Sequence, residues 1–144
     1  MSNKTDDLKL PIYLFHQGTN YKSYELLGVH AGKKGYCFRV WAPNAKAVSV
    51  VGDFNGWDSE KNPMRLIPDS GIWEAVLSAK EGGFYKYCIT TQAEKQILKA
   101  DPYCVWAQTE DQTASVVYDL EGKFIWKDQK WEAYKEKHSV YDGP

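Results

Sequence analysis

Tyr36-Cys37-Phe38-Arg39-Val40-Trp41 is the stretch of sequence that decides the fold. Its side chains alternate with a period of two, which places Tyr36, Phe38 and Val40 on one face of an extended strand and the other three residues on the opposite face. Pro43-Asn44 then ends the strand. A strand of this kind needs a sheet on which to bury its apolar face.

Further short segments of the same kind follow along the chain, separated by turns. These segments are preceded or followed by typical turn sequences: Asn55-Gly56, Asp69-Ser70-Gly71, Glu81-Gly82-Gly83 and Asp101-Pro102. The predicted strands are 47–51, 72–77, 84–91 and 114–118. With no helical run between these strands, the pattern predicts an all-β protein built as a β-sandwich and excludes a parallel α/β architecture.

The two ends of the chain differ from this central pattern. Residues 1–11 show no apolar periodicity and end at Pro11, so we expect a mobile amino-terminal tail. The β-sandwich domain is expected over 12–125, with one helical turn near its start that Ser23 caps and Gly28 ends. Residues 126–144 are expected to form a carboxy-terminal segment leading to a domain absent from this sequence.

A short helix is predicted inside that carboxy-terminal segment. Asp128 is its expected cap, and Trp131 and Tyr134 share one side of a helix running to Lys137. The Gly143-Pro144 ending is typical of a domain junction.

Composition limits the possible partners and the compartment. The 18 Lys and Arg residues nearly balance the 19 Asp and Glu residues, so no positive field is available for nucleic acid or an anionic membrane. Residues 1–10 are polar rather than a signal peptide, and Cys37, Cys88 and Cys104 show no C-x-x-C spacing. We therefore expect a cytoplasmic protein with reduced cysteines that binds neither nucleic acid nor membrane.

Residues suited to catalysis or cofactor binding are few. His16, His30 and His138 have no partners at catalytic or metal-ligand spacing, and no phosphate-binding glycine loop is present. Asp53 and Asp58 flank one turn, where turn formation explains them better than paired-carboxylate chemistry. We expect no catalytic residue, no metal and no cofactor in this sequence.

Aromatic residues make up 15% of the chain, and both core packing and sugar stacking use such side chains. Trp57 follows the Asn55-Gly56 turn, where the indole faces either solvent or the edge of the sandwich. Lys86 alternates with two tyrosines and is expected to point outward. Trp41, Trp73 and Trp106 lie in or beside strands, and we assign them mainly to core or edge packing.

Six ordered motifs identify a family resemblance that covers about residues 13–131. Together they resemble the amino-terminal domain of 1,4-α-glucan (glycogen) branching enzymes, a family 48 carbohydrate-binding module. The resemblance implies an immunoglobulin-like sandwich, in agreement with the strand pattern. The motifs are Tyr24–His30, Phe38–Ala45, Val50–Trp57, Gly71–Glu74, Tyr85–Tyr87 and Lys99–Tyr103.

The same resemblance implies a carbohydrate-binding site and its limits. Trp57 occupies the position of the stacking tryptophan, Lys86 that of the strand lysine, and Thr113 and Ser115 those of a threonine and an asparagine. A second stacking tryptophan is replaced by Leu98. The expected ligand is an α-1,4-glucan such as glycogen or a maltooligosaccharide, bound weakly because one of two stacking faces is missing.

The resemblance also implies where the chemistry of the parent enzyme lies. Branching enzymes transfer α-1,4-linked chains to α-1,6 branch points with carboxylates of a (β/α)₈ barrel, and 144 residues are too few for such a barrel. The barrel is the second expected partner, contacted through the amino-terminal aromatics or Trp126, Trp131 and Tyr134. A stand-alone glycogen-binding scaffold subunit and the equivalent domain of a debranching enzyme are the alternatives.

Overall fold

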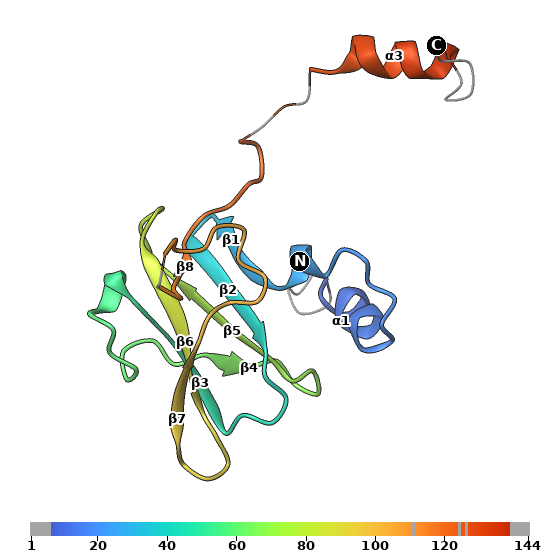
Figure 1. Ribbon diagram of the computed structural model, residues 1–144. Helices are drawn as coiled ribbons and strands as arrows, with labels where there is room; N and C mark the ends of the chain where they lie inside the picture. The colour runs from blue at the N-terminus through green and yellow to red at the C-terminus, as the bar shows by residue number, and fades with distance from the viewer. Residues whose placement is uncertain (1–6, 111, 124, 126, 139–144) are drawn as a thin grey trace.

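The computed structural model describes residues 7–110, 112–123, 125 and 127–138. Figure 1 shows short strands folded into a sandwich, with helical segments at both ends of the chain. In chain order, the elements are α1 (Lys9–His16), α2 (Ser23–Leu26), β1 (Gly28–Gly32), β2 (Gly35–Trp41), β3 (Ala47–Gly52), η1 (Asp53–Asn55), β4 (Arg65–Leu66), β5 (Ile72–Leu77), β6 (Phe84–Thr90), β7 (Gln96–Lys99), β8 (Ser115–Val116) and α3 (Gln129–Lys137).

The strands form two antiparallel sheets. Strands β1, β2, β5 and β4 form the first sheet in that order, and β3, β6 and β7 form the second, in which β8 also pairs with β6. We call them the first sheet and the second sheet. This arrangement confirms the predicted all-β, immunoglobulin-like sandwich.

The core lies between the two sheets, as the alternation in β2 predicts. Phe38 and Val40 are buried, and Phe38 packs edge-on against Tyr85 of β6 with ring centroids 5.1 Å apart. Tyr87 and Val50 complete the centre of this core from the second sheet. The inward positions of β3 and β6 therefore alternate with positions that face outward from the second sheet.

The structure moves the amino-terminal boundary. Helix α1 begins at Lys9, so Pro11 lies within its first turn rather than at the end of a tail. A proline is accepted there because the first amide groups of a helix have no intrahelical acceptor. Ile12 and Phe15 of this helix pack against a second cluster of buried residues, formed by Leu26, Leu27, Ile67 and Ile72.

The predicted helical turn is present, but Ser23 is not its cap. Helix α2 runs over Ser23–Leu26 with Lys22 at the N-cap position, and the Ser23 hydroxyl donates to the Asn20 carbonyl at 2.7 Å. Gly28 follows with φ +95° and opens β1. The serine therefore secures the loop before the helix instead of the helix itself.

The carboxy-terminal helix is present over Gln129–Lys137, and Figure 1 shows it apart from the sandwich. Asp128 occupies the N-cap position without a side-chain hydrogen bond to the helix. Trp131 and Tyr134 stack on each other with ring centroids 5.6 Å apart. In the described part of the chain, no helix has both the length and the apolar character needed to cross a bilayer.

Candidate functional site

A buried asparagine shapes the turn after β3. The Asn55 side-chain oxygen accepts hydrogen bonds from the backbone amides of Gly52 and Trp57, both at 3.1 Å. Its amide group donates to the Val50 carbonyl at 2.9 Å and to the Asn62 side chain at 2.8 Å. Asn55 therefore ties the turn to β3 and to the following loop, which fixes the point where Trp57 leaves the backbone.

Trp57 has a backbone conformation that is rare for a bulky residue. Its φ is +61°, directly after Gly56 at +67°. Side chains with a Cβ disfavour this left-handed region, and such strain is concentrated at functional sites. The indole is 40% exposed. Of the two positions that the sequence leaves open for the indole, solvent or the edge of the sandwich, the structure shows a ring that is partly open to solvent.

Asp53 links the Trp57 indole to β6. One carboxylate oxygen accepts a hydrogen bond from the indole nitrogen of Trp57 at 3.1 Å, and the other accepts from the Phe84 amide at 2.9 Å. This bridge orients the ring relative to the second sheet. The sequence predicts only a turn role for Asp53, because its contact with Phe84 spans 31 positions of the chain.

Lys86 and Thr113 meet on the outer face of the second sheet. Lys86 lies between the buried Tyr85 and Tyr87 in β6, so its side chain points away from the core. Its ammonium group donates to the Thr113 hydroxyl at 2.7 Å. The structure thus brings together two residues that the sequence places 27 positions apart.

Ser115 does not join this surface. The residue is fully buried, and its hydroxyl accepts a hydrogen bond from the Asp101 amide at 2.9 Å. Strand β8 begins at Ser115 and pairs it with the inward-facing Tyr85, which turns its side chain toward the core. The expectation that Ser115 contacts a surface ligand is therefore not met by this structure.

Leu98 lies where the missing second tryptophan was expected. It pairs with Cys88 in the register of β6 and β7, so it shares the outer face with Lys86. More than half of its side chain is exposed. A branched aliphatic side chain at this position offers apolar contact but no flat ring for stacking.

The histidines are occupied by local contacts. A ring nitrogen of His30 lies 2.9 Å from the Leu27 carbonyl, and a ring nitrogen of His138 lies 2.9 Å from the Tyr134 carbonyl. His16 lies at the end of α1, edge-on to Phe15. Within the described residues, no three side chains of His, Cys, Asp or Glu are arranged to hold a metal ion.

Comparison with protein families shows to which family the chain belongs. Residues 26–104 match the family described as carbohydrate-binding module 48 (isoamylase N-terminal domain). The chain belongs to this family. The matched range contains both sheets up to β7, including Trp57 and Lys86, while Thr113 lies beyond it.

Branching enzymes are among the relatives of this family 48 module. The 1,4-alpha-glucan branching enzyme of Halothermothrix orenii is 49% identical over 137 residues, which cover 92% of this chain and 22% of the relative. That of Bacillus caldolyticus is 43% identical over 148 residues, covering 99% of this chain and 22% of the relative. The module thus spans about a fifth of the length of these relatives.

Solved structures similar to the module include pullulanases. The maltotriose complex of PulA from Klebsiella pneumoniae aligns with a TM-score of 0.57 and 29% identity, covering 71% of the module and 12% of that chain. The pullulanase from Bacillus acidopullulyticus aligns with a TM-score of 0.55 and 27% identity, covering 72% and 13%. These likenesses agree with the sandwich described above.

Proposed function

We propose that the module is the amino-terminal α-glucan-binding domain of a 1,4-α-glucan branching enzyme and is itself non-catalytic. The observation that carries the proposal is the similarity to branching enzymes over 92–99% of the chain. The parent enzyme would transfer α-1,4-linked chains to α-1,6 branch points. Its chemistry would belong to the remaining part of the polypeptide, about four-fifths of the length in these relatives.

The second sheet supplies contacts suited to a sugar chain. The exposed Trp57 indole offers a flat apolar face, and the Lys86 ammonium and Thr113 hydroxyl offer hydrogen bonds on the outer face of the second sheet. Leu98 supplies no stacking ring at its own position. We therefore expect weak binding, with a dissociation constant on the order of millimolar.

Titration with maltoheptaose tests this function directly. We expect nuclear magnetic resonance shifts at the Trp57 indole N–H and at the amides of Lys86 and Thr113 as the sugar is added. Trp57→Ala should weaken binding at least about fivefold, because it removes the stacking face. Trp41→Ala is the control, since Trp41 is similarly exposed on the first sheet. Unchanged resonances at all three residues would contradict the proposal.

Two alternatives are distinguished by other observations. A stand-alone scaffold subunit would have no catalytic domain, so the coding sequence beyond Pro144 decides between it and a branching enzyme. The second alternative is the equivalent domain of a debranching enzyme. The pullulanase structures quoted above are 27–29% identical to the module, whereas the branching enzymes are 43–49% identical to it. The higher identity favours the branching enzymes.

We place the parent enzyme in the cytoplasm, without a nucleic-acid or membrane partner. The support is the near balance of charges and the absence of a C-x-x-C spacing among the cysteines. Fractionation of the native host would test this location, and recovery of the enzyme outside the cytoplasmic fraction would contradict it.

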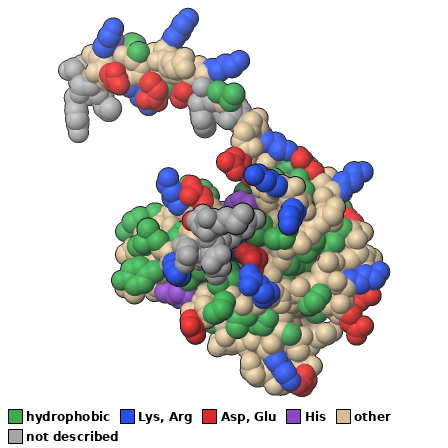
Figure 2. Space-filling model, turned by 180° about the vertical axis from the view of Figure 1, so that it is seen from behind, with side chains coloured by type: hydrophobic (Ala, Val, Ile, Leu, Met, Phe, Trp, Pro, Cys, Tyr) green, Lys and Arg blue, Asp and Glu red, His purple; other side chains and the backbone are tan. Residues whose placement is uncertain are grey.

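A second candidate function is docking onto the catalytic part of the same polypeptide. We define the amino-terminal patch as Leu10, Tyr13, Tyr21 and Tyr24, each more than half exposed. Figure 2 shows hydrophobic side chains gathered around α1, at the left of that view. An apolar patch of this kind is typical of an interaction surface. The occupant we propose is the remaining four-fifths of the parent chain.

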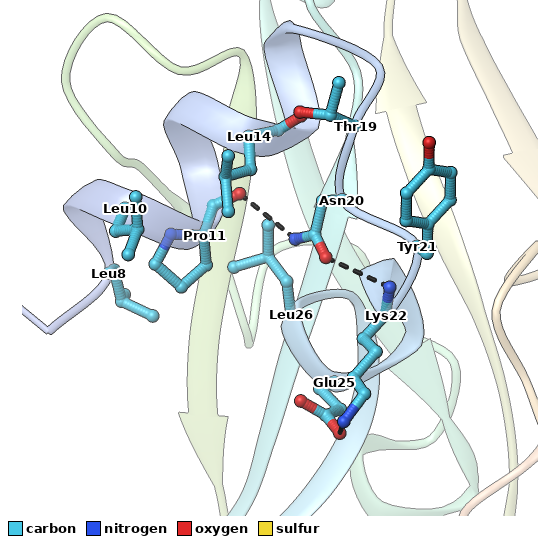
Figure 3. A pocket seen from close by; sticks show the side chains of 10 residues that line it. All are labelled: Leu8, Leu10, Pro11, Leu14, Thr19, Asn20, Tyr21, Lys22, Glu25 and Leu26. Atoms are coloured by element: carbon cyan, nitrogen blue, oxygen red, sulfur yellow. Dashed lines mark hydrogen bonds and ion pairs between the residues drawn. The ribbon is translucent and has the colours of Figure 1, made fainter.

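A groove adjoins the amino-terminal patch. Leu10, Pro11 and Leu14 of α1 face Leu26 of α2 across it, with Tyr21 at its rim (Figure 3). The Asn20 side chain donates to the Pro11 carbonyl at 3.1 Å and accepts from the Lys22 amide at 3.1 Å, which keeps the two helices in place. The groove is thus a fixed feature into which an apolar side chain of a neighbouring domain can fit.

Two other aromatics expected to dock, Trp131 and Tyr134, are also more than half exposed but stack on each other. Trp126 lies outside the described residues. The amino-terminal patch is therefore the better-defined candidate surface.

Hydrogen exchange tests the docking function. We expect the amides of 8–26 to exchange more slowly in the full-length parent enzyme than in the 144-residue chain, because the catalytic part covers them. Amides of 86–99 serve as the internal control, since they lie on the other sheet. Equal exchange of 8–26 in both proteins would contradict docking, as would concentration-dependent dimerisation of the short chain through this patch.

A further inference from the structure

Trp106 lies on an additional extended segment at the edge of the second sheet. Its carbonyl accepts a hydrogen bond from the Val116 amide at 2.9 Å, and Gln108 donates to the Ala114 carbonyl at 2.9 Å. Ala107 forms an antiparallel bridge with Ser115. The segment around Trp106 therefore continues the sheet beyond β8, on the side of β6 opposite to β3.

The register places Trp106 on the outer face of this sheet. Ser115 is buried and pairs with the inward-facing Tyr85, and Ala107 lies opposite Ser115, so the Ala107 side chain points to the same face, where it stays exposed at the edge of the sheet. The next residue along an extended segment faces the other way. Trp106 is next to Ala107, and Lys86 is next to the inward-facing Tyr85. Trp106 and Lys86 therefore share the outer face of the second sheet.

The Trp106 indole is both fixed and accessible. Its ring lies edge-on to Tyr118, with centroids 5.4 Å apart and an interplanar angle of 87°. The Lys123 ammonium lies 4.4 Å from the centroid of Tyr118 and forms an ion pair with Glu81, which anchors that tyrosine. Trp106 remains 51% exposed. Trp106 therefore packs at the edge of the sheet, as the sequence predicts, and in addition keeps about half of its surface free.

We propose that Trp106 is a second stacking platform for the α-glucan, in place of the ring that Leu98 does not supply. This inference rests on the proposed glucan-binding function. The Trp57 amide is hydrogen-bonded to the carbonyl of Gly52, the last residue of β3. The segment that carries Trp106 lies three strand spacings from β3, across β6 and β8, which puts the two backbones roughly 14 Å apart.

Two rings held by backbone segments this far apart select an extended ligand. Lys86 lies on β6, between β3 and the Trp106 segment, and bonds Thr113 just before β8. A chain of several glucose units can therefore stack at both ends and donate or accept hydrogen bonds in the middle. A disaccharide reaches only one ring at a time. The module therefore binds long, unbranched α-1,4-linked segments in preference to short ones.

The test compares Trp106→Ala with Trp41→Ala, its matched control. Both indoles are about half exposed, and each lies edge-on to one aromatic ring, but Trp41 lies on the first sheet beside Phe15. We expect Trp106→Ala to raise the dissociation constant for maltoheptaose about fivefold or more and to leave the dissociation constant for maltose unchanged. Trp106→Phe should restore part of the lost affinity, because it restores an aromatic ring. Trp41→Ala should change neither.

The outcomes separate this inference from the proposed function. If Trp57→Ala weakens maltoheptaose binding and Trp106→Ala behaves like Trp41→Ala, the second platform is wrong while the glucan-binding function stands. An equal loss for maltose and maltoheptaose in Trp106→Ala would also overturn the two-ring arrangement. If maltoheptaose shifts neither indole resonance, the glucan-binding function itself fails.

Discussion

Asp101→Ala is expected to lower the free energy of unfolding by about 3–5 kcal/mol, because it removes the acceptor of several buried donors. One Asp101 carboxylate oxygen accepts from the Tyr85 hydroxyl at 2.6 Å and from the Tyr87 hydroxyl at 3.2 Å. The other accepts from the Tyr103 amide at 2.8 Å. Both tyrosines are fully buried, so water cannot replace the lost acceptor.

Urea unfolding followed by fluorescence measures this loss. Asp58→Ala is the control, because Asp58 is exposed and accepts a single turn hydrogen bond, from Glu60. The double variant Tyr85→Phe, Tyr87→Phe should lessen the additional cost of Asp101→Ala, since the donors are then absent. A cost for Asp101→Ala no larger than that of Asp58→Ala would show that this cluster does not stabilise the sandwich.

The Asp101 carboxyl group also determines how the stability of the folded state changes with pH. Burial raises the pKa of Asp101 above its ordinary value of 3.8, although hydrogen bonds from Tyr85, Tyr103 and Tyr87 oppose the rise. The folded state therefore holds this proton more tightly than the unfolded state. The resulting stabilisation is fully present below about pH 3.8 and is lost as the pH rises through the folded-state pKa.

Asp101→Asn isolates this effect, because an amide does not titrate in that range. As the pH falls toward 3.8, the free energy of unfolding of the protein with Asp101 should rise relative to that of the Asp101→Asn variant. Glu74 acts in the opposite direction: burial opposes ionisation, but Arg39 and Arg65 lower its pKa overall. It contributes equally to both proteins and cancels in the difference. A difference that stays constant with pH would contradict the shifted pKa of Asp101.

Gly52→Ala is expected to cost about 3 kcal/mol of stability and to abolish glucan binding at the Trp57 turn. A Cβ at Gly52 would lie 2.4 Å from the Phe84 carbonyl oxygen and 2.7 Å from a ring carbon of Phe54. The carbonyl belongs to β6, so it cannot move without disturbing the sheet. The displaced turn would carry Asp53 and Trp57 with it.

Gly56→Ala is the matched control for this substitution. Nothing lies within 4 Å of a Cβ there, so only the left-handed φ of +67° opposes the change, at a cost of about 1 kcal/mol. Urea unfolding and a maltoheptaose titration of both variants measure the contrast. Similar stability and binding in the two variants would show that the space at Gly52 is not required.

Much of the sandwich could be predicted because local patterns and tertiary packing agree. The alternation in 36–41 marks β2, and Ile72–Leu77 is β5 with the predicted bounds. Strand β1 was not predicted, since it contains two glycines and is stabilised by pairing along its whole length with β2 across the turn at 33–34. Helix α1 was not predicted, because its stability comes from packing onto the cluster around Leu26 and Ile72.

The sequence by itself determined the all-β class, the turn that presents Trp57 and the outward position of Lys86, because a period of two in a strand is local information. Only the tertiary structure decided which residues share the outer face of the second sheet. Thr113 and Ser115 are two positions apart, yet Thr113 contacts Lys86 and Ser115 is buried, because β8 begins at Ser115 and pairs it with Tyr85. The register between strands sets the face of every side chain, and register depends on partners distant in the chain.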